Sequence, residues 1–171
     1  MKITIYIATS ANGSISNSRN VPDWLSDEYG SGMMEICNRY RAVIMGRTTY
    51  DIIAPDYLPF SKDGIIKVMS RQKNLKPANA AVQFTSESPH EIVSDLERLG
   101  YLHAVIIGGT QAMSAFLRDG LVNDVYLVVE PVFFGKGLPL FEQVEFECKL
   151  DLLKSKKLNS NTIQLHYQVR K

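Results

Sequence analysis

A short segment in the second half of the chain is apolar at every position and runs directly into two glycines. Residues 104–107 read Ala-Val-Ile-Ile, and Gly108-Gly109 precede a helical pattern from Gln111 to about Arg118. A strand that is apolar on both faces is typical of the centre of a parallel sheet covered by helices. Residues 42–45 (Ala-Val-Ile-Met) are also apolar throughout and are followed by Gly46. Strands of this kind that alternate with helices predict an α/β fold with right-handed crossovers.

Other segments extend the predicted sheet toward both ends of the chain. Ile3, Ile5 and Ile7 alternate with polar residues, which predicts a strand over residues 2–9 with one strongly apolar face. Segments near residues 145–155 and 162–169 predict a C-terminal hairpin and therefore an antiparallel edge. Three further strands are expected at residues 65–69, 81–85 and 125–129.

Helix signals separate these strands, and polar or glycine-rich segments connect them. We expect one helix to open at Pro22-Asp23 and to bend at Gly30 and Gly32. A second should span Thr48 to Ile53 and stop before Pro55. A third begins at Ser88, which forms a capping box with Glu91, and ends at Gly100. Residues 10–20 and 131–139 are expected to be loops.

Composition narrows the classes of protein that this chain can represent. Its 171 residues, 45% hydrophobic and 22% charged, predict one globular domain over residues 1–171. Net charge is +1, from 19 basic and 18 acidic residues, so a nucleic-acid partner is not expected. No apolar run is long enough for a membrane span. The two cysteines, Cys37 and Cys148, lie outside any CxxC pattern, which predicts reduced thiols, a cytoplasmic location and no metal site.

The residues with ligand-binding chemistry follow the predicted strands. In an open parallel sheet, ligands bind beyond the carboxyl ends of the strands. Gly108-Gly109 would let backbone approach a phosphate at a helix N-terminus, although a tight turn without a ligand accounts for the same dipeptide. Arg47 and Arg71 each follow a strand and suit a phosphate monoester, although solvated surface arginines would look the same. Taken together, a pyrophosphate site beside a monoester site matches the charge layout of NADPH.

Several acidic residues are candidates for proton transfer. Asp23, Asp27 and Glu28 lie around Trp24 and are explained equally by the preference of helix starts for acids. Glu130 ends an apolar strand, where a carboxylate must be paired, solvated or shifted in pKa. We therefore expect Asp27, Glu28 or Glu130 to be catalytic, and Asp23 and Trp24 to contact the substrate.

Four motifs resemble those of the dihydrofolate-reductase-like superfamily. Residues 7–13 (Ile-Ala-Thr-Ser-Ala-Asn-Gly) resemble its opening segment, residues 43–50 (Val-Ile-Met-Gly-Arg-Thr-Thr-Tyr) its strand and phosphate-binding turn, and residues 106–109 its second cofactor turn. Residues 135–141 (Gly-Lys-Gly-Leu-Pro-Leu-Phe) and 23–25 (Asp-Trp-Leu) are similar to the riboflavin-biosynthesis reductase branch. That branch includes the reductase domain of the bifunctional riboflavin deaminase-reductase and stand-alone bacterial homologues.

This resemblance implies a three-layer fold with a mixed, mostly parallel eight-stranded sheet, helices on both faces and NADPH bound across the strand ends. It implies a cis Gly108–Gly109 peptide and a small heterocyclic substrate. Arg47, Ser70 and Arg71 would meet the 2′-phosphate, and Ala8 and the loop 12–14 would cover the nicotinamide. The implied cofactor-binding set is Ala8, Gly13, Gly46, Arg47, Thr48, Thr49, Ser70, Arg71, Gly108, Gly109, Thr110 and Gln111.

Two departures from the family pattern affect the substrate. The substrate-binding acid of dihydrofolate reductase would fall near Gly30, and a lysine expected in the first strand is Tyr6 here. The resemblance then leaves Lys136 as the obvious cation in the expected substrate loop, where it would contact the phosphorylated ribose of the substrate. The leading hypothesis is an NADPH-dependent reductase of the riboflavin type, ranked above dihydrofolate reductase. Dihydrofolate reductase and a non-catalytic NADP(H)-binding sensor are the alternatives. A homodimer is also expected, and Val132-Phe133-Phe134 could contribute to an interface or to the core.

Overall fold

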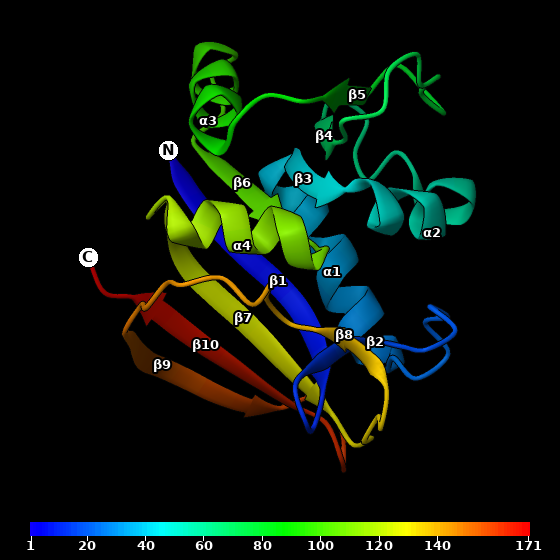
Figure 1. The fold of residues 1–171 in the computed structure, drawn as a ribbon, viewed down its shortest axis with the longest axis vertical. Coiled ribbons are helices and arrows are strands. Elements are labelled where there is room, and N and C mark those ends of the chain that lie inside the picture. Colours follow the sequence, from blue (N-terminus) through cyan, green and yellow to red (C-terminus); the bar gives the residue numbers. More distant parts are fainter.

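One eight-stranded sheet runs through the molecule, in the order β5-β4-β3-β6-β1-β7-β10-β9 (Figure 1). A computed structural model describes residues 1–171, apart from the side chain of Pro55. Neighbouring strands from β5 to β7 are parallel, whereas β10 is antiparallel to both β7 and β9. The strands of this sheet are β1 (Lys2–Ser10), β3 (Ala42–Gly46), β4 (Ile65–Met69), β5 (Val82–Thr85), β6 (His103–Ile106), β7 (Val122–Glu130), β9 (Leu150–Lys157) and β10 (Ile163–Val169).

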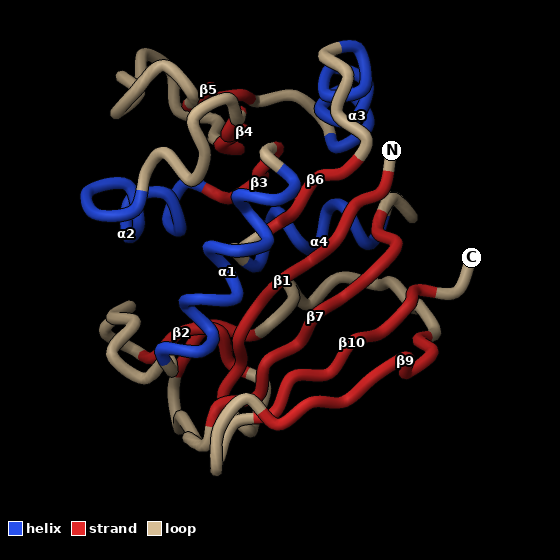
Figure 2. The backbone as a smooth tube through the Cα atoms, turned by 180° about the vertical axis from the view of Figure 1, so that it is seen from behind, coloured by secondary structure: helices blue, strands red, loops and turns tan.

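Helices cover both faces of this sheet and enclose two hydrophobic clusters (Figures 1 and 2). Side chains of α1 and α2 pack in the cluster on one face, and side chains of α3 and α4 pack in the cluster on the other. The alternation in β1 divides its side chains between them, since Ile3, Ile5 and Ile7 join one cluster and Tyr6 and Ala8 the other. The helices are α1 (Asp27–Tyr40), α2 (Arg47–Tyr57), α3 (Pro89–Arg98) and α4 (Thr110–Arg118).

The predicted α/β fold with an antiparallel C-terminal edge is confirmed, whereas the predicted start and bend of α1 are wrong. The helix begins at Asp27, because the Ser26 hydroxyl caps it by accepting a hydrogen bond from Tyr29 N at 3.3 Å. It continues without a break through Gly30 and Gly32. A glycine costs only about 1 kcal/mol in a helix, which the packing of the buried face of α1 offsets. At Gly32 a Cβ atom would lie 2.2 Å from the Tyr6 hydroxyl, so the glycine permits close packing of α1 on β1.

Three other boundaries also differ from the predictions. Helix α2 continues past Pro55 to Tyr57, since the burial of Tyr50 and Ile53 offsets the backbone hydrogen bond that a proline cannot donate. Both expected loops contain a short strand, β2 (Ser14–Asn17) and β8 (Gly137–Pro139). These two strands pair with each other, and pairing between distant segments leaves no local sequence signal. Strand β9 begins at Leu150 rather than near residue 145.

In the described part of the chain, no helix has the length and apolar character needed to cross a membrane.

A buried ion pair joins the sheet to α3. Lys67 of β4 is only 4% exposed, and its ammonium group donates to the carboxylate of Asp95. This hydrogen bond lowers the pKa of Asp95. Arg98, one turn farther along α3, contacts the other carboxylate oxygen from a more exposed position. Lys67 is therefore the group that depends on Asp95 for its charge balance.

We predict that Asp95→Asn destabilises the protein by about 3 kcal/mol, because it leaves a buried ammonium group without its counter-charge. The measurement is urea unfolding at neutral pH. Asp151→Asn is the matched control, since Asp151 pairs with Arg170 at the surface and should change stability by less than about 1 kcal/mol. Because the pKa of Asp95 is depressed, the stabilisation is present above the ordinary carboxyl pKa and is lost as the pH falls below it. Equal losses in the two variants would contradict this account.

Candidate functional site

The carboxyl ends of the adjacent strands β3 and β6 meet through their backbones. Gly46 N donates to the carbonyl oxygen of Gly108 at 2.9 Å, and Ile107 N donates to Ile44 O at 3.1 Å. Each strand passes directly into a helix, with Gly46 as the N-cap of α2 and Gly109 as the N-cap of α4. Two helix N-termini therefore begin side by side at this edge of the sheet.

The backbones at this meeting point lie so close together that a side chain would have little room. A Cβ atom on Gly46 would lie 3.3 Å from Gly109 N, and one on Gly108 would lie 3.1 Å from Thr49 Oγ1. Gly108 also has a φ of +124°, a conformation that side chains disfavour. The Gly108–Gly109 peptide is cis, as the resemblance implied. The hydroxyl of Thr49 thus lies against the diglycine, and these residues form one continuous surface that we call the glycine cradle (Gly46, Thr49, Gly108 and Gly109).

Both helix N-termini beside the glycine cradle lack a side-chain cap. The N–H groups of the first helical turn have no acceptor within the helix, and together they favour an anion. Thr48 lies in the first turn of α2, and Thr110 and Gln111 open α4. The Thr110 hydroxyl donates to Pro139 O at 2.7 Å, so it fastens α4 to β8 instead of capping its own helix. The arrangement provides two sets of donors for an anionic ligand.

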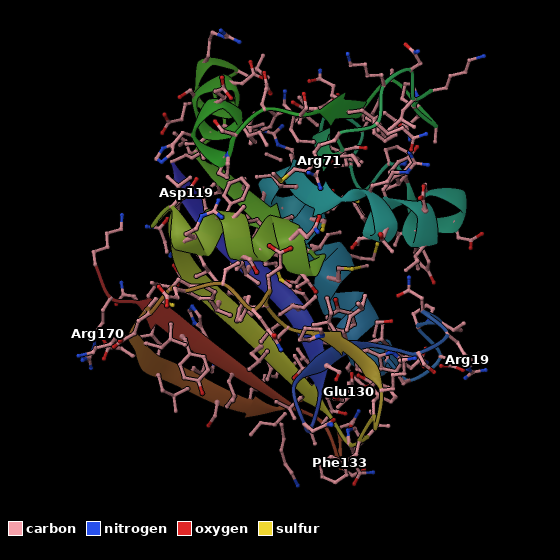
Figure 3. The ribbon with its side chains drawn as sticks, viewed as in Figure 1. Arg19, Arg71, Asp119, Glu130, Phe133 and Arg170 are labelled. Atoms are coloured by element: carbon pink, nitrogen blue, oxygen red, sulfur yellow. The ribbon has the colours of Figure 1, made fainter. Side chains whose placement is uncertain are left out.

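Arg47 and Arg71 follow two neighbouring strands, β3 and β4. Gly46 is in register with Met69 of β4, so Arg47 and the Ser70-Arg71 pair leave neighbouring strands at the same edge. Both carboxylate oxygens of Asp51 accept from Arg47 Nε, at 2.7 and 2.8 Å, and Arg47 Nη1 donates to Gln72 Oε1 at 3.3 Å. Arg71 is exposed, and Figure 3 shows it near β3.

The loop after β1 forms the other end of this region and is fastened to the loop after β7. Asn12 Nδ2 donates to Phe134 O at 2.7 Å, while Asn12 Oδ1 accepts from Phe134 N at 3.1 Å and from the Ser10 hydroxyl at 2.8 Å. Gly13 has a φ of +83° and its carbonyl accepts from Leu140 N at 3.0 Å. Ala8, 2% exposed, lies just before this loop in β1. One asparagine side chain thus holds two loops that are far apart in sequence.

The three residues predicted to contact substrate lie in or near these loops. The Trp24 ring packs edge-on against Phe134, with ring centroids 5.2 Å apart. Asp23 pairs at the surface with Arg19 at 2.9 Å, and Lys136 is exposed in the segment between β7 and β8. Phe133, which is 77% exposed, marks this end of the molecule in Figure 3. Trp24 is therefore partly buried against Phe134, while Asp23 and Lys136 remain at the surface.

Glu130 is buried and both of its carboxylate oxygens are engaged. One oxygen accepts from Ser26 N at 3.0 Å and from the Ser26 hydroxyl at 2.7 Å. The other accepts from the Thr162 hydroxyl at 2.9 Å. With 1% exposure, Glu130 connects the end of β7 to the N-cap of α1 and to the turn before β10. These contacts are those of a residue that positions α1.

Asp27 and Glu28 line a cleft of about 730 Å³ between α1 and the strands β7, β10 and β9. Glu28 accepts a hydrogen bond from Asn159 at 2.9 Å, which lowers the pKa of this exposed carboxyl group. Tyr6 lies in the same cleft, and burial raises its pKa to about 12. Among the residues that line this cleft, none belongs to the predicted cofactor-binding set. The structure therefore gathers the predicted cofactor residues at one edge and places two of the predicted catalytic acids elsewhere.

Three residues that hydrogen-bond to Arg47, Asn12 or Glu130 were not identified from the sequence. Asp51 stands four residues after Arg47 on a helix, a spacing that predicts such a pair. Phe134 and Thr162 carry no comparable signal, because Asn12 and Glu130 reach them across 122 and 32 residues of chain.

Comparisons with known proteins identify the family of the chain. The RibD C-terminal domain family matches residues 1–164, so the chain belongs to this family. Protein YwjB of Bacillus subtilis, whose function is uncharacterised, is 27% identical over 172 residues, which cover 97% of each chain.

Solved structures show the same fold at lower identity. A protein of Shewanella sp. PV-4 whose name refers to riboflavin biosynthesis has a TM-score of 0.82 at 22% identity and covers 100% of both chains. Dihydrofolate reductase from Enterococcus faecalis, complexed with NADP(H), has a TM-score of 0.74 at 14% identity and covers 99% of this chain and 97% of that one. The predicted dihydrofolate-reductase-like fold is confirmed.

We predict that Asn12→Asp loosens the contact between the two loops, because a carboxylate cannot donate to the Phe134 carbonyl. Trp24 is the single tryptophan of the chain, and its packing on Phe134 makes its fluorescence a direct reporter. The emission of Asn12→Asp should shift to longer wavelength, with a stability loss of about 1 kcal/mol. Asn38→Asp, at an exposed position of α1, is the control and should leave the emission unchanged. An unchanged spectrum in both variants would contradict the proposed fastening.

Proposed function

We propose that this member of the RibD C-terminal domain family is an NADPH-dependent reductase of a pterin- or aminouracil-like small molecule. Its activity would be most like that of 5-amino-6-(5-phosphoribosylamino)uracil reductase of riboflavin biosynthesis. The observation that carries this proposal is the pair of uncapped helix N-termini at the glycine cradle, with Arg47 and Arg71 beside it. Family membership supports the reaction class. The two cysteines are both free, which fits a cytoplasmic location.

The glycine cradle fits a dinucleotide diphosphate. The glycines let the two strand ends pack closely, so the first turns of α2 and α4 present their N–H donors side by side. Thr48, Thr49, Thr110 and Gln111 would hold the diphosphate together with Gly46, Gly108 and Gly109. Arg47, Ser70 and Arg71 would hold the 2′-phosphate, and Ala8 and Gly13 would lie at the nicotinamide. When bound, NADPH supplies the hydride.

The ion pair between Arg47 and Asp51 prepares the guanidinium group for a phosphate. Asp51 engages Nε, and Gln72 engages Nη1 from a neighbouring segment. An arginine fixed in this way loses less conformational freedom when a ligand binds. The planar guanidinium group can then present its remaining N–H groups to phosphate oxygens.

The nicotinamide end would be shaped by the fastened loops. Ala8 is buried in β1 just before these loops, and the Trp24 and Phe134 rings would form an apolar side of the nicotinamide site. The lowered pKa of Glu28 makes it an ionised acceptor near neutral pH, so it would need to receive a proton before it could supply one. Asp27 remains a candidate for proton delivery, and we propose that Glu130 positions α1.

One observation favours a second candidate function, a non-catalytic NADP(H)-binding sensor. The glycine cradle and the cleft that contains Asp27 and Glu28 share no lining residue, and the oxygens of Glu130 are already engaged. Dihydrofolate reduction is a weaker alternative, because the corresponding position in α1 is Gly30.

We predict that Arg47→Ala and Arg71→Ala each weaken NADPH binding by about ten-fold or more, because a charge-assisted contact contributes about 1.5–3 kcal/mol. The affinity for NADH, which lacks the 2′-phosphate, should change by less than about three-fold. Titration calorimetry measures both cofactors. Arg98→Ala, at an exposed arginine of α3, is the matched control. Equal losses for NADPH and NADH would show that the arginines do not recognise the 2′-phosphate.

We further predict NADPH oxidation with a phosphoribosylaminouracil, measured as loss of the reduced nicotinamide absorbance. Lys136→Ala should raise KM for this substrate by about ten-fold and leave KM for its dephosphorylated form unchanged, because one charge-assisted contact to the phosphate is lost. Lys62→Ala, at an exposed lysine after α2, is the control. Tight NADPH binding without turnover of aminouracils, pterins or dihydrofolate would favour the sensor. Failure to bind NADPH would overturn both functions.

A further inference from the structure

A short segment after β7 connects helix α4 with the loop that follows β1. Residues 137–142, which we call the strap, comprise β8 and residues 140–142. The strap runs beside β2, at the end of the sheet where α4 begins (Figure 1). It therefore contacts both the helix that opens the diphosphate end of the proposed cofactor site and the loop expected at the nicotinamide end.

Two hydroxyl groups of α4 hold the strap from one side. The Thr110 hydroxyl donates to Pro139 O at 2.7 Å, and the Ser114 hydroxyl accepts from Glu142 N at 2.9 Å. Residues that are four positions apart lie on the same face of a helix, so both hydroxyls point toward the strap. Leu140, between the two contacts, packs in the hydrophobic cluster to which α4 contributes. The strap is thus fixed to α4 by polar and apolar contacts.

The other side of the strap is paired with the loop after β1. Strand β8 is antiparallel to β2, and Leu140 N donates to Gly13 O at 3.0 Å. A Cβ atom on Gly137 would lie 2.2 Å from Ser16 O, so the two strands can approach this closely because residue 137 is a glycine. The loop after β1 is therefore fastened to α4 through the strap.

We infer that Thr110 is a positioning residue for the nicotinamide end of the site, although it opens the helix at the diphosphate end. The link to the nicotinamide rests on the proposed function, whereas the fastening of the strap does not. The Thr110 hydroxyl has one proton, which it donates to Pro139 O. An ionised phosphate oxygen only accepts hydrogen bonds, so this hydroxyl has no donor left for it. The backbone N–H of Thr110 has no acceptor within the helix and can serve the diphosphate.

The first test is hydrogen exchange of the ligand-free protein, measured by mass spectrometry. In Thr110→Val, which keeps the shape but not the donor, residues 10–17 and 137–142 should exchange about five-fold faster, because one hydrogen bond no longer opposes opening of the strap. Thr110→Ser keeps the donor and should exchange like the unaltered protein. Residues 89–98 of α3 should exchange equally in all three proteins. Equal exchange of the strap in the valine and serine variants would overturn the inference.

The second test compares two ligands that share the diphosphate and the 2′-phosphate. NADPH carries the nicotinamide, whereas 2′-phospho-ADP-ribose ends at the ribose to which the nicotinamide would be attached. In titration calorimetry, Thr110→Val should weaken NADPH about five-fold and 2′-phospho-ADP-ribose less than about two-fold, because only NADPH uses the loop after β1. Equal weakening would show that the hydroxyl holds the diphosphate and would overturn the inference.

A second variant breaks the strap without altering α4. Gly137→Ala presses a Cβ atom on Ser16 O, so it should reproduce both effects of Thr110→Val. Gly135→Ala is the matched control, since a Cβ atom there meets no atom within 4 Å, and it should behave like the unaltered protein. Circular dichroism and thermal unfolding establish that each variant is folded. Unchanged exchange of residues 10–17 in Gly137→Ala would contradict a role of the strap.

Failure of this inference and failure of the proposed function give different results. If the unaltered protein binds neither NADPH nor 2′-phospho-ADP-ribose, the proposed function fails, and hydrogen exchange still decides whether Thr110 fastens the strap. If both ligands bind and Thr110→Val weakens them equally, the cofactor site stands and the inference about Thr110 is wrong.

Discussion

The hydrogen bond from Gly46 N to the Gly108 carbonyl is the contact on which the candidate site depends. It joins the ends of β3 and β6 at the point where both strands turn into helices. A Cβ atom at Gly46 would press on Gly109 N and one at Gly108 on the Thr49 hydroxyl, so either substitution requires its neighbour to shift by a few tenths of an ångström. With the ends joined, the N-termini of α2 and α4 lie side by side. One backbone contact therefore brings two strand-to-helix connections together, at the place where we propose that the anionic cofactor binds.

A second constraint lies at the other end of the site, where Glu130 holds three segments together. Burial of a carboxylate is costly unless its oxygens are hydrogen-bonded, and Ser26 and Thr162 provide those bonds. Ser26 also caps α1, so the position of that helix is coupled to the end of β7. Asn12 performs a similar task for the loops after β1 and β7. The segments around the expected nicotinamide position are thus joined by directional hydrogen bonds, those of Glu130 buried and those of Asn12 exposed.

The same arrangement separates two regions of different chemical character. The edge formed by the ends of β4, β3, β6 and β1 concentrates backbone donors and guanidinium groups, and we propose that the anionic cofactor binds there. The cleft beside β7, β10 and β9 is lined by acidic groups of α1 and by lysines of β9. Helix α1 connects the two regions, because Glu130 holds its N-cap at Ser26 and its Asp27, Glu28 and Glu35 line the cleft.

The sequence by itself determined the order and type of most elements, because the period of apolar residues is a local property. Continuous apolar runs identified β3 and β6, and the Ser88–Glu91 capping box identified α3. Glycines and arginines after the strands predicted the edge at which we propose that the cofactor binds. The β2–β8 pairing was decided by contact between distant segments. The start of α1 was decided by the local Ser26 cap together with Glu130, which accepts from Ser26 across the chain. Tertiary structure alone separated Asp27 and Glu28 from the glycine cradle and engaged Glu130 with Ser26 and Thr162. Which groups face each other across a sheet depends on long-range packing, and residue spacing along one chain does not encode it.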